Sequence, residues 1–262
     1  MDNVDEGLES ERDYAAEKPA IPGELASALR SLRLLGDDPF LSMQATNIDV
    51  VDRLCMALEQ QTLEALISEE RTPSEAILLN AQTQLWMFGA YEVLRTWRVR
   101  AKKVLKWARN GGLPARIAHL RRDVGFRHYA QEMQALQLEE MLKDKDAVMI
   151  IDTDLRRSHI AFGRIKALRI AFAKHEVAGK QNSVAFAPGY GRIDQWTGSL
   201  KYEISVGRAI LDHVSRRDIA NDLRAISLLP APPQETLDAF DEFMQGPGDE
   251  NPFAPGSPPI AM

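Results

Sequence analysis

The sequence predicts a mainly α-helical protein: a bundle of about four long helices around a buried central helix, with a small antiparallel β-hairpin or meander and a C-terminal helix. Three observations support this fold class. The segment 72–110 has apolar side chains on three sides of a helix. Several other stretches repeat apolar residues at helical spacing. After Gly179 the composition becomes strand-like, with intervening turn residues.

The central helix is expected over residues 73–109. Ser74 and Glu75 follow Pro73 in the pattern of a helix start, and Asn110 with the two glycines after it ends the pattern. Because a helix that is apolar all round is normally buried, we expect other helices to pack around this one.

Two helical segments precede the central helix. Residues 24–35 form a short pattern, and residues 47–70 form a long one with Asn47 as a candidate N-cap. Only a short connection separates the second segment from the central helix. These two helices should therefore be antiparallel neighbours.

Two long segments follow the central helix, over residues 114–143 and 145–176. Gly125 lies near the middle of the first and weakens its helical pattern. In the second, His159 and Arg169 fall on the apolar stripe, so both side chains need polar partners inside the protein.

The meander is expected at about residues 180–214, with strands over 184–187, 199–205 and 209–214. A last helix, at about residues 215–229, should begin with a capping box in which Ser215 is paired with Asp218. The predicted domain therefore spans residues 24–230.

Both ends outside this domain are predicted to be disordered. Residues 1–23 form an acidic tail, and residues 231–262 form a proline-rich acidic tail. Residues 1–18 contain seven acids and two bases, and residues 231–262 contain six acids and no base. The remaining 30 bases and 25 acids make the body basic.

Several classes of protein are disfavoured. The chain has no signal-peptide pattern and no stretch of about 18 consecutive apolar residues, which predicts a soluble, cytoplasmic protein without a membrane segment. Cys55 is the single cysteine and lies on an apolar helix stripe, as a core residue does. The five histidines form no metal-binding pair on a helix face, so neither a metal nor a cofactor is expected.

Two arginine-histidine spacings suggest a family. Arg122 is followed by the polar Asp123 and then by His128, and Arg169 is followed by His175. The first pattern resembles the signature of the HEPN superfamily, whose members are helical bundles and often metal-independent ribonucleases. The resemblance implies that His128 assists the 2′-hydroxyl while Arg122 holds the phosphate, with Arg169 and His175 as the alternative pair. Ile170 stands where a polar residue is usual in the second pattern.

A dense run of basic residues could bind a polyanion, either RNA or an acidic protein partner. It comprises Arg95, Arg98, Arg100, Lys102, Lys103, Lys106, Arg109, Arg116, Arg121, Arg122 and Arg127. The alternative is a solvated helix end that the acidic tails balance.

Two function classes remain open, since the sequence leaves undecided whether this protein is an enzyme. The first is a regulatory or interaction protein, and the second is a HEPN-like endoribonuclease. Residues 237–244 in the C-terminal tail have the spacing of a short acidic amphipathic helix that can dock in cis, on the basic run, or in trans. The oligomeric state does not follow from the sequence.

Overall fold

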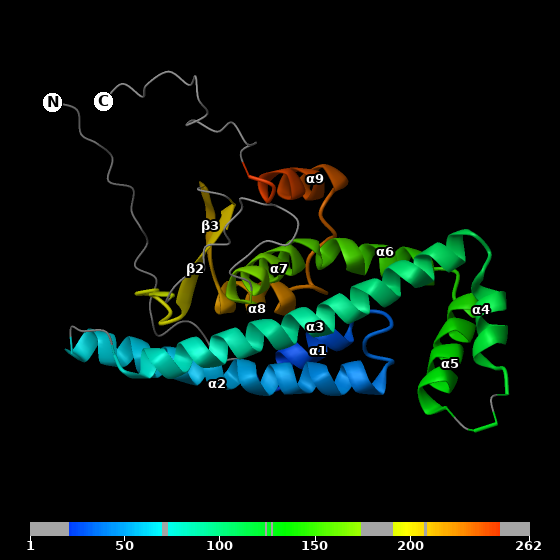
Figure 1. The fold of residues 1–262 in the computed structure, drawn as a ribbon, viewed down its shortest axis with the longest axis horizontal. Coiled ribbons are helices and arrows are strands. Elements are labelled where there is room, and N and C mark those ends of the chain that lie inside the picture. Colours follow the sequence, from blue (N-terminus) through cyan, green and yellow to red (C-terminus); the bar gives the residue numbers. More distant parts are fainter. Residues whose placement is uncertain are drawn as a thin grey trace, which may run out of the picture.

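The computed structural model describes residues 21–69, 73–123, 125–126, 128–173, 191–206 and 209–246 (Figure 1). In this part of the chain the protein is mainly α-helical with a small three-stranded antiparallel sheet, which confirms the predicted fold class. The predicted strand over 184–187, His175, the first twenty residues and the end of the chain from 247 lie outside the described residues.

Two long helices, α2 (Pro39–Glu69) and α3 (Glu75–Arg109), form an antiparallel hairpin along the length of the molecule (Figure 1). The start predicted for α2 is wrong, because Asn47 lies inside the helix. Asp38 caps α2 instead: its Oδ1 accepts hydrogen bonds from the backbone N–H groups of Phe40, at 3.0 Å, and Leu41, at 2.9 Å. Pro39 then occupies the first helical position, where its missing N–H costs nothing.

The core gathers around α3, in which Trp86 and Trp97 are almost completely buried. The prediction that α3 is buried on all sides is wrong. Ile77, Leu78 and Leu85, in its first half, are more than half exposed. One face of α3 therefore remains apolar and open among the described residues.

The segment 114–143 is two helices, α4 (Leu113–Leu120) and α5 (Tyr129–Lys143), that pack against each other at one end of the molecule (Figure 1). Gly125 adopts a φ of 79°, a left-handed conformation that interrupts a helix. The single helix predicted here is therefore wrong. The segment 145–176 is also divided, because a turn at Ser158 separates α6 (Ala147–Arg157) from α7 (His159–Ala173).

The short helix α1 (Glu24–Arg30) packs on α2. The carboxylate of Asp49 accepts hydrogen bonds from three backbone N–H groups around the start of α1, those of Gly23, Leu25 and Ala26. A side chain from α2 thus satisfies the open donors of α1.

The sheet has the order β1 (Arg192–Ile193), β2 (Leu200–Val206) and β3 (Ala209–Ser215). β3 leads directly into α8 (Arg216–Arg224), and the predicted capping box between Ser215 and Asp218 is confirmed. The sheet and α8 pack against α7, which places the start of α8 beside α2 and α3.

The last described helix, α9 (Gln234–Phe243), lies within the segment that we expected to be a disordered tail. It contacts α7 on the side of the molecule away from α2 (Figure 1). Burial of Leu237 explains why so short a helix forms here. None of the helices in the described ranges is both long and apolar enough to cross a membrane.

Candidate functional site

Arg122 and His128 lie in the loop that joins α4 to α5, not inside a helix as we expected. α4 ends at Leu120, and His128 is the N-cap of α5. Both side chains line one open hollow of about 420 Å³ at the tip of this helical pair. Its lining residues are Leu120, Arg121, Arg122, Asp123, Gly125, Phe126, His128, Gln131 and Glu132. The two residues of the first motif are therefore brought together at an exposed site.

The hydrogen bond of His128 determines what its ring can do. Its Nδ1 accepts from the backbone N–H of Gln131 at 3.4 Å, so the proton of the neutral ring lies on Nε2. In that tautomer Nε2 can donate a hydrogen bond to an anion or to a leaving group. It cannot take a proton from a hydroxyl group, which is the role that the resemblance implied.

The second motif is only half described, because His175 lies outside the described residues. Arg169 lies on α7 with its guanidinium 5.2 Å from the centre of the Tyr91 ring, a cation-π contact. This contact supplies the partner that we expected for Arg169. An aromatic ring, rather than an open groove, therefore faces this arginine.

The basic run predicted between Arg95 and Arg127 divides into three groups in the structure. Four of its arginines are paired with acids, in the ion pairs Arg95–Glu92, Arg100–Asp38, Arg109–Asp152 and Arg121–Glu139. Arg98 is 5% exposed and cannot bind a partner at the surface, so its assignment to the polyanion-binding set is wrong. Arg127 lies outside the described residues.

The residues of the third group have no acidic partner in the described part of the chain. Within the described ranges, Lys102, Lys103, Lys106, Arg116 and Arg122 have no acidic side chain at ion-pair distance. The three lysines are exposed and fall on one face of α3, because positions three and four apart share a helix face. No acid in the described part of the chain pairs with this lysine face, whereas Arg95, Arg100 and Arg109 of the same helix have acidic partners.

Buried Arg98 belongs to a polar contact between α3, the α6–α7 turn and α9. Its Nη1 donates to the carbonyl of Leu155 at 2.8 Å and to the hydroxyl of Ser158 at 2.6 Å. Burial lowers the pKa of Arg98 to about 10, so the side chain is still charged at neutral pH. His159, the second residue that we expected to need a partner, joins Arg98 to α9. Its Nδ1 is 3.4 Å from Arg98 Nη2 and its Nε2 is 2.7 Å from Asp241 Oδ1.

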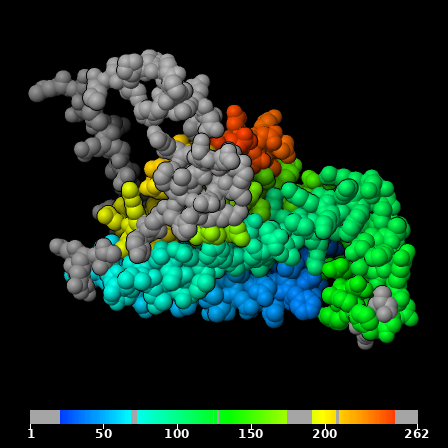
Figure 2. Space-filling view, viewed as in Figure 1, coloured from blue at the N-terminus to red at the C-terminus, as the bar shows by residue number. Residues whose placement is uncertain are grey.

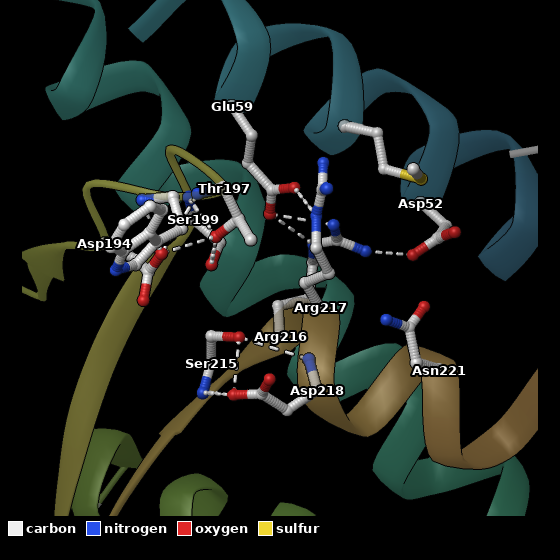
Figure 3. A network of polar contacts seen from close by, with 12 residues as sticks. Asp52, Glu59, Asp194, Thr197, Ser199, Ser215, Arg216, Arg217, Asp218 and Asn221 are labelled. Carbon is white, nitrogen blue, oxygen red and sulfur yellow. Dashed lines mark hydrogen bonds and ion pairs between the residues drawn. The ribbon is translucent and has the colours of Figure 1, made fainter. Parts of the chain in front are cut away.

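The most buried group of charges was not predicted. It joins α2 to both ends of α8, and the residues at the start of α8 are shown in Figure 3. Arg216 is fully buried and donates to Asp52 and, through Nε at 3.1 Å and Nη2 at 2.7 Å, to Oε1 of Glu59. Arg217 donates to the other oxygen of Glu59 at 2.9 Å, and Arg224 donates to Asp52. The buried cluster formed by these five residues holds α8 against α2.

The electrostatics of this buried cluster follow from its burial. Burial raises the pKa of Asp52, against the lowering effect of Arg216 and Arg224. Burial also works against a charged Arg216, but the charges of Glu59 and Asp52 outweigh it and raise the pKa of the guanidinium. Because Asp52, Glu59 and Arg216 are at most 1% exposed, the buried cluster presents no surface to a ligand. Its role is structural.

A turn beside the buried cluster anchors the sheet to α2 (Figure 3). Asp194 Oδ1 accepts from the backbone N–H groups of Trp196 at 2.9 Å and Thr197 at 3.0 Å. Gly198 has a φ of 69°, and a Cβ there would lie 2.0 Å from the carbonyl oxygen of Glu59. Only glycine fits this approach of the turn to α2.

A second hollow, of about 470 Å³, lies where α7, the sheet and α8 meet. Arg164 spans it, with Asp212 at 3.4 Å on one side and Asp222 at 3.2 Å on the other. Lys201 and His213 also line it. Charges of both signs pair with each other here, so the hollow has no clear preference for an anion or a cation.

Among the residues whose positions are described, no group of three or more His, Cys, Asp or Glu side chains could hold a metal ion. In comparisons with known proteins, no family model, no curated protein and no solved structure matches this chain.

Proposed function

We propose that this protein is a regulatory or interaction protein that binds a polyanionic partner through the lysine face of α3, with Arg116 and Arg122 beside it on α4 and the following loop. One observation supports the proposal. Lys102, Lys103 and Lys106 share an exposed helix face and have no acidic partner in the described part of the chain, although most nearby arginines do. Exposed lysines without acidic partners bind a polyanion favourably because they displace the counterions that surround the polyanion.

The test compares two triple variants with the same change in net charge. In one, Lys102, Lys103 and Lys106 are replaced by Gln, and in the other the exposed Lys143, Lys145 and Lys166 are replaced. Binding of fluorescein-labelled oligouridylate is measured by anisotropy from low to moderate salt. We expect the first variant to reduce the slope of log K against log salt by about 2, since each contact contributes about 0.7 on a single strand.

The control variant should keep the wild-type slope within error. Equal binding by the two variants at every salt concentration would show that the lysine face of α3 is not the binding surface. Competition by poly-glutamate would indicate that charge, rather than a nucleotide, is recognised.

The shared hollow of Arg122 and His128 favours a second candidate, a HEPN-like metal-independent endoribonuclease. In this proposal Arg122 holds the scissile phosphate, the Nε2–H group of neutral His128 donates a hydrogen bond to the leaving 5′-oxygen, and water supplies the proton that this oxygen takes up. The 2′-hydroxyl then needs another base, and Glu132 lines the same hollow.

This candidate is tested by incubating single-stranded RNA with the purified protein in EDTA. Activity should be lost in Arg122→Ala and in His128→Ala but kept in His119→Ala, which replaces an exposed histidine of α4. If the wild-type protein cleaves no RNA, or if His128→Ala cleaves as fast as His119→Ala, the second candidate is removed. The lysine-face proposal is unaffected, because its readout is binding alone.

A further inference from the structure

From Phe40 to Gln61 the outer side of α2 carries no charged residue, and the next position in the same spacing is the exposed Glu64. Seven positions spaced alternately three and four apart form the α2 seam: Phe40, Met43, Asn47, Val50, Leu54, Ala57 and Gln61. All seven are exposed, and the four large apolar side chains among them are 47–56% exposed. In Figures 1 and 2, α2 forms the lower edge of the molecule to the left of α4 and α5, which extend lower than α2 beyond its first residues.

This composition is the reverse of what a solvent-facing helix normally shows. The α2 seam lies opposite the buried Ile48 and Cys55, on the side where a surface helix usually carries charged residues. The acids of this part of α2 are buried instead, and Arg53 stands at the flank. Apolar side chains without charge are typical of the centre of a protein interface.

The spacing indicates what kind of surface covers the α2 seam. Alternating steps of three and four are the heptad pattern with which one helix packs along another. The α2 seam is about 32 Å long, at about 1.5 Å per residue. A second helix of similar length and equally free of charge would match it.

We propose that a second copy of this chain packs on the α2 seam, with the two α2 helices antiparallel about a twofold axis between Asn47 and Val50. In this register Phe40 of one copy lies opposite Ala57 of the other, and Met43 lies opposite Leu54. Each large side chain meets a smaller or complementary one, so the two helices keep an even separation along the contact. A parallel pair would place Phe40 against Phe40 and Ala57 against Ala57, which leaves the contact wide at one end and narrow at the other.

Charge and polarity agree with this register. Arg53 faces Gln44 of the other copy, so no like charges meet across the axis. The two Asn47 residues are offset by about 4.5 Å along the direction of the helices, and this offset lets their side-chain amides hydrogen-bond each other. A buried Asn in a heptad seam fixes the register of the helices.

The mass of the full chain in solution tests the proposal. Sedimentation equilibrium should show a monomer of 29.3 kDa in equilibrium with a dimer of twice that mass. Replacing Val50 and Leu54 by Glu should raise the dissociation constant by about 100-fold or more, because four charges are then placed in the dry contact. The far-UV circular dichroism should not change, because both side chains are exposed in the monomer.

Ile77→Glu is the matched control, since Ile77 is 71% exposed on α3, outside the α2 seam. It should dimerise like the wild type. A wild-type chain that stays monomeric at millimolar concentration overturns the proposal, and so does a dimer that survives the double Glu substitution.

Disulfide trapping tests the orientation. When Asn47→Cys and Val50→Cys proteins are mixed and oxidised, the antiparallel register predicts a heterodimer in preference to either homodimer. Efficient trapping of Phe40→Cys protein alone would show a parallel pair and overturn the proposed register, because the antiparallel register places the two residues 40 about 25 Å apart along the helices. The native Cys55 is fully buried and does not interfere.

Discussion

Arg216 of α8 and Glu59 of α2 are joined by two hydrogen bonds inside the protein, although 157 residues separate them in the chain. The guanidinium also lies 5.6 Å from the centre of the Trp86 ring, so it is packed as well as paired. This contact connects the last part of the domain to its first long helix. The stability of the whole domain should depend on it.

Replacing Arg216 by Met should therefore destabilise the protein by about 3–5 kcal/mol, because Asp52 and Glu59 are then buried without their main partner. Urea unfolding followed by circular dichroism measures the change. Arg109→Met is the control, since its ion pair with Asp152 is exposed and should be worth less than about 1 kcal/mol. Equal losses in the two variants would show that the buried cluster is not needed for stability.

Asp194 should make the stability of the protein depend on pH. Burial works against its charged form, but hydrogen bonds from Lys201, Trp196 and Thr197 outweigh burial and hold the pKa of Asp194 below its ordinary value of 3.8. A depressed carboxyl pKa contributes stability above the unfolded value, and this contribution is lost as pH falls through the folded value.

The difference in unfolding free energy between the wild type and Asp194→Asn should thus be about 1–2 kcal/mol and equal at pH 7 and 5. At pH 3 it should be smaller. Urea titrations at the three pH values measure it, and a difference that stays constant down to pH 3 would contradict the prediction.

Cys55 should be unreactive while the protein is folded. Its side chain is buried, and burial raises the pKa of the thiol to about 12. At pH 8 this leaves about three orders of magnitude less thiolate than in an ordinary cysteine. Ellman's reagent should therefore modify Cys55 at the rate of global unfolding and become fast in denaturant. Rapid modification of the folded protein, at a rate independent of its stability, would be inconsistent with this burial.

The docking of α9 on α7 should depend on the fit between Phe240 and Gly163. A Cβ at position 163 would lie 2.5 Å from the Phe240 ring, so Gly163→Ala should push α9 away without altering its sequence. Phe240→Ala should also loosen α9, by removing the ring.

Hydrogen exchange of the α9 amides measures this effect. Both substitutions should accelerate exchange by about tenfold or more, equivalent to about 1.4 kcal/mol, whereas Phe243→Ala, at a side chain that is 46% exposed, should not. If α9 stays protected in Gly163→Ala, its position does not depend on this contact.

Features with a strong local signal could be predicted from the sequence. Pro73 and the residues 110–112 gave nearly correct ends for α3, and the spacing of Ser215 and Asp218 gave the capping box of α8. The strands β2 and β3 also agree with their predicted ranges to within a residue or two. In each case the deciding interaction lies within a few residues of the chain.

Other features depend on contacts between distant residues. Asp52 and Glu59 share the core side of α2, which indicates that they need basic partners, but the pattern cannot say which arginines supply them. Arg98 was misassigned because we grouped it by its charge. Its spacing from Leu94, Ala101 and Leu105 would have placed it on the buried face of α3.

The setting of Arg122 and His128 differs from the one that their motif predicted. Arg122 and His128 do meet in one hollow, yet the left-handed backbone at Gly125 puts them in a loop. The tautomer of His128 follows from its position as an N-cap, which no spacing between arginine and histidine encodes. Chemistry at this site depends on the backbone of the loop as much as on the motif.

The buried cluster also sets an order for folding during synthesis. The chain emerges from its N-terminus, so α2 and α3 can pair while Arg216 is still inside the ribosome. Until then Asp52 and Glu59 face water or an unfinished core, and the helical hairpin lacks the contact that holds α8 in place. A chain truncated before residue 216 should therefore remain a helical but loosely packed intermediate, and the final compaction must wait for the last quarter of the protein.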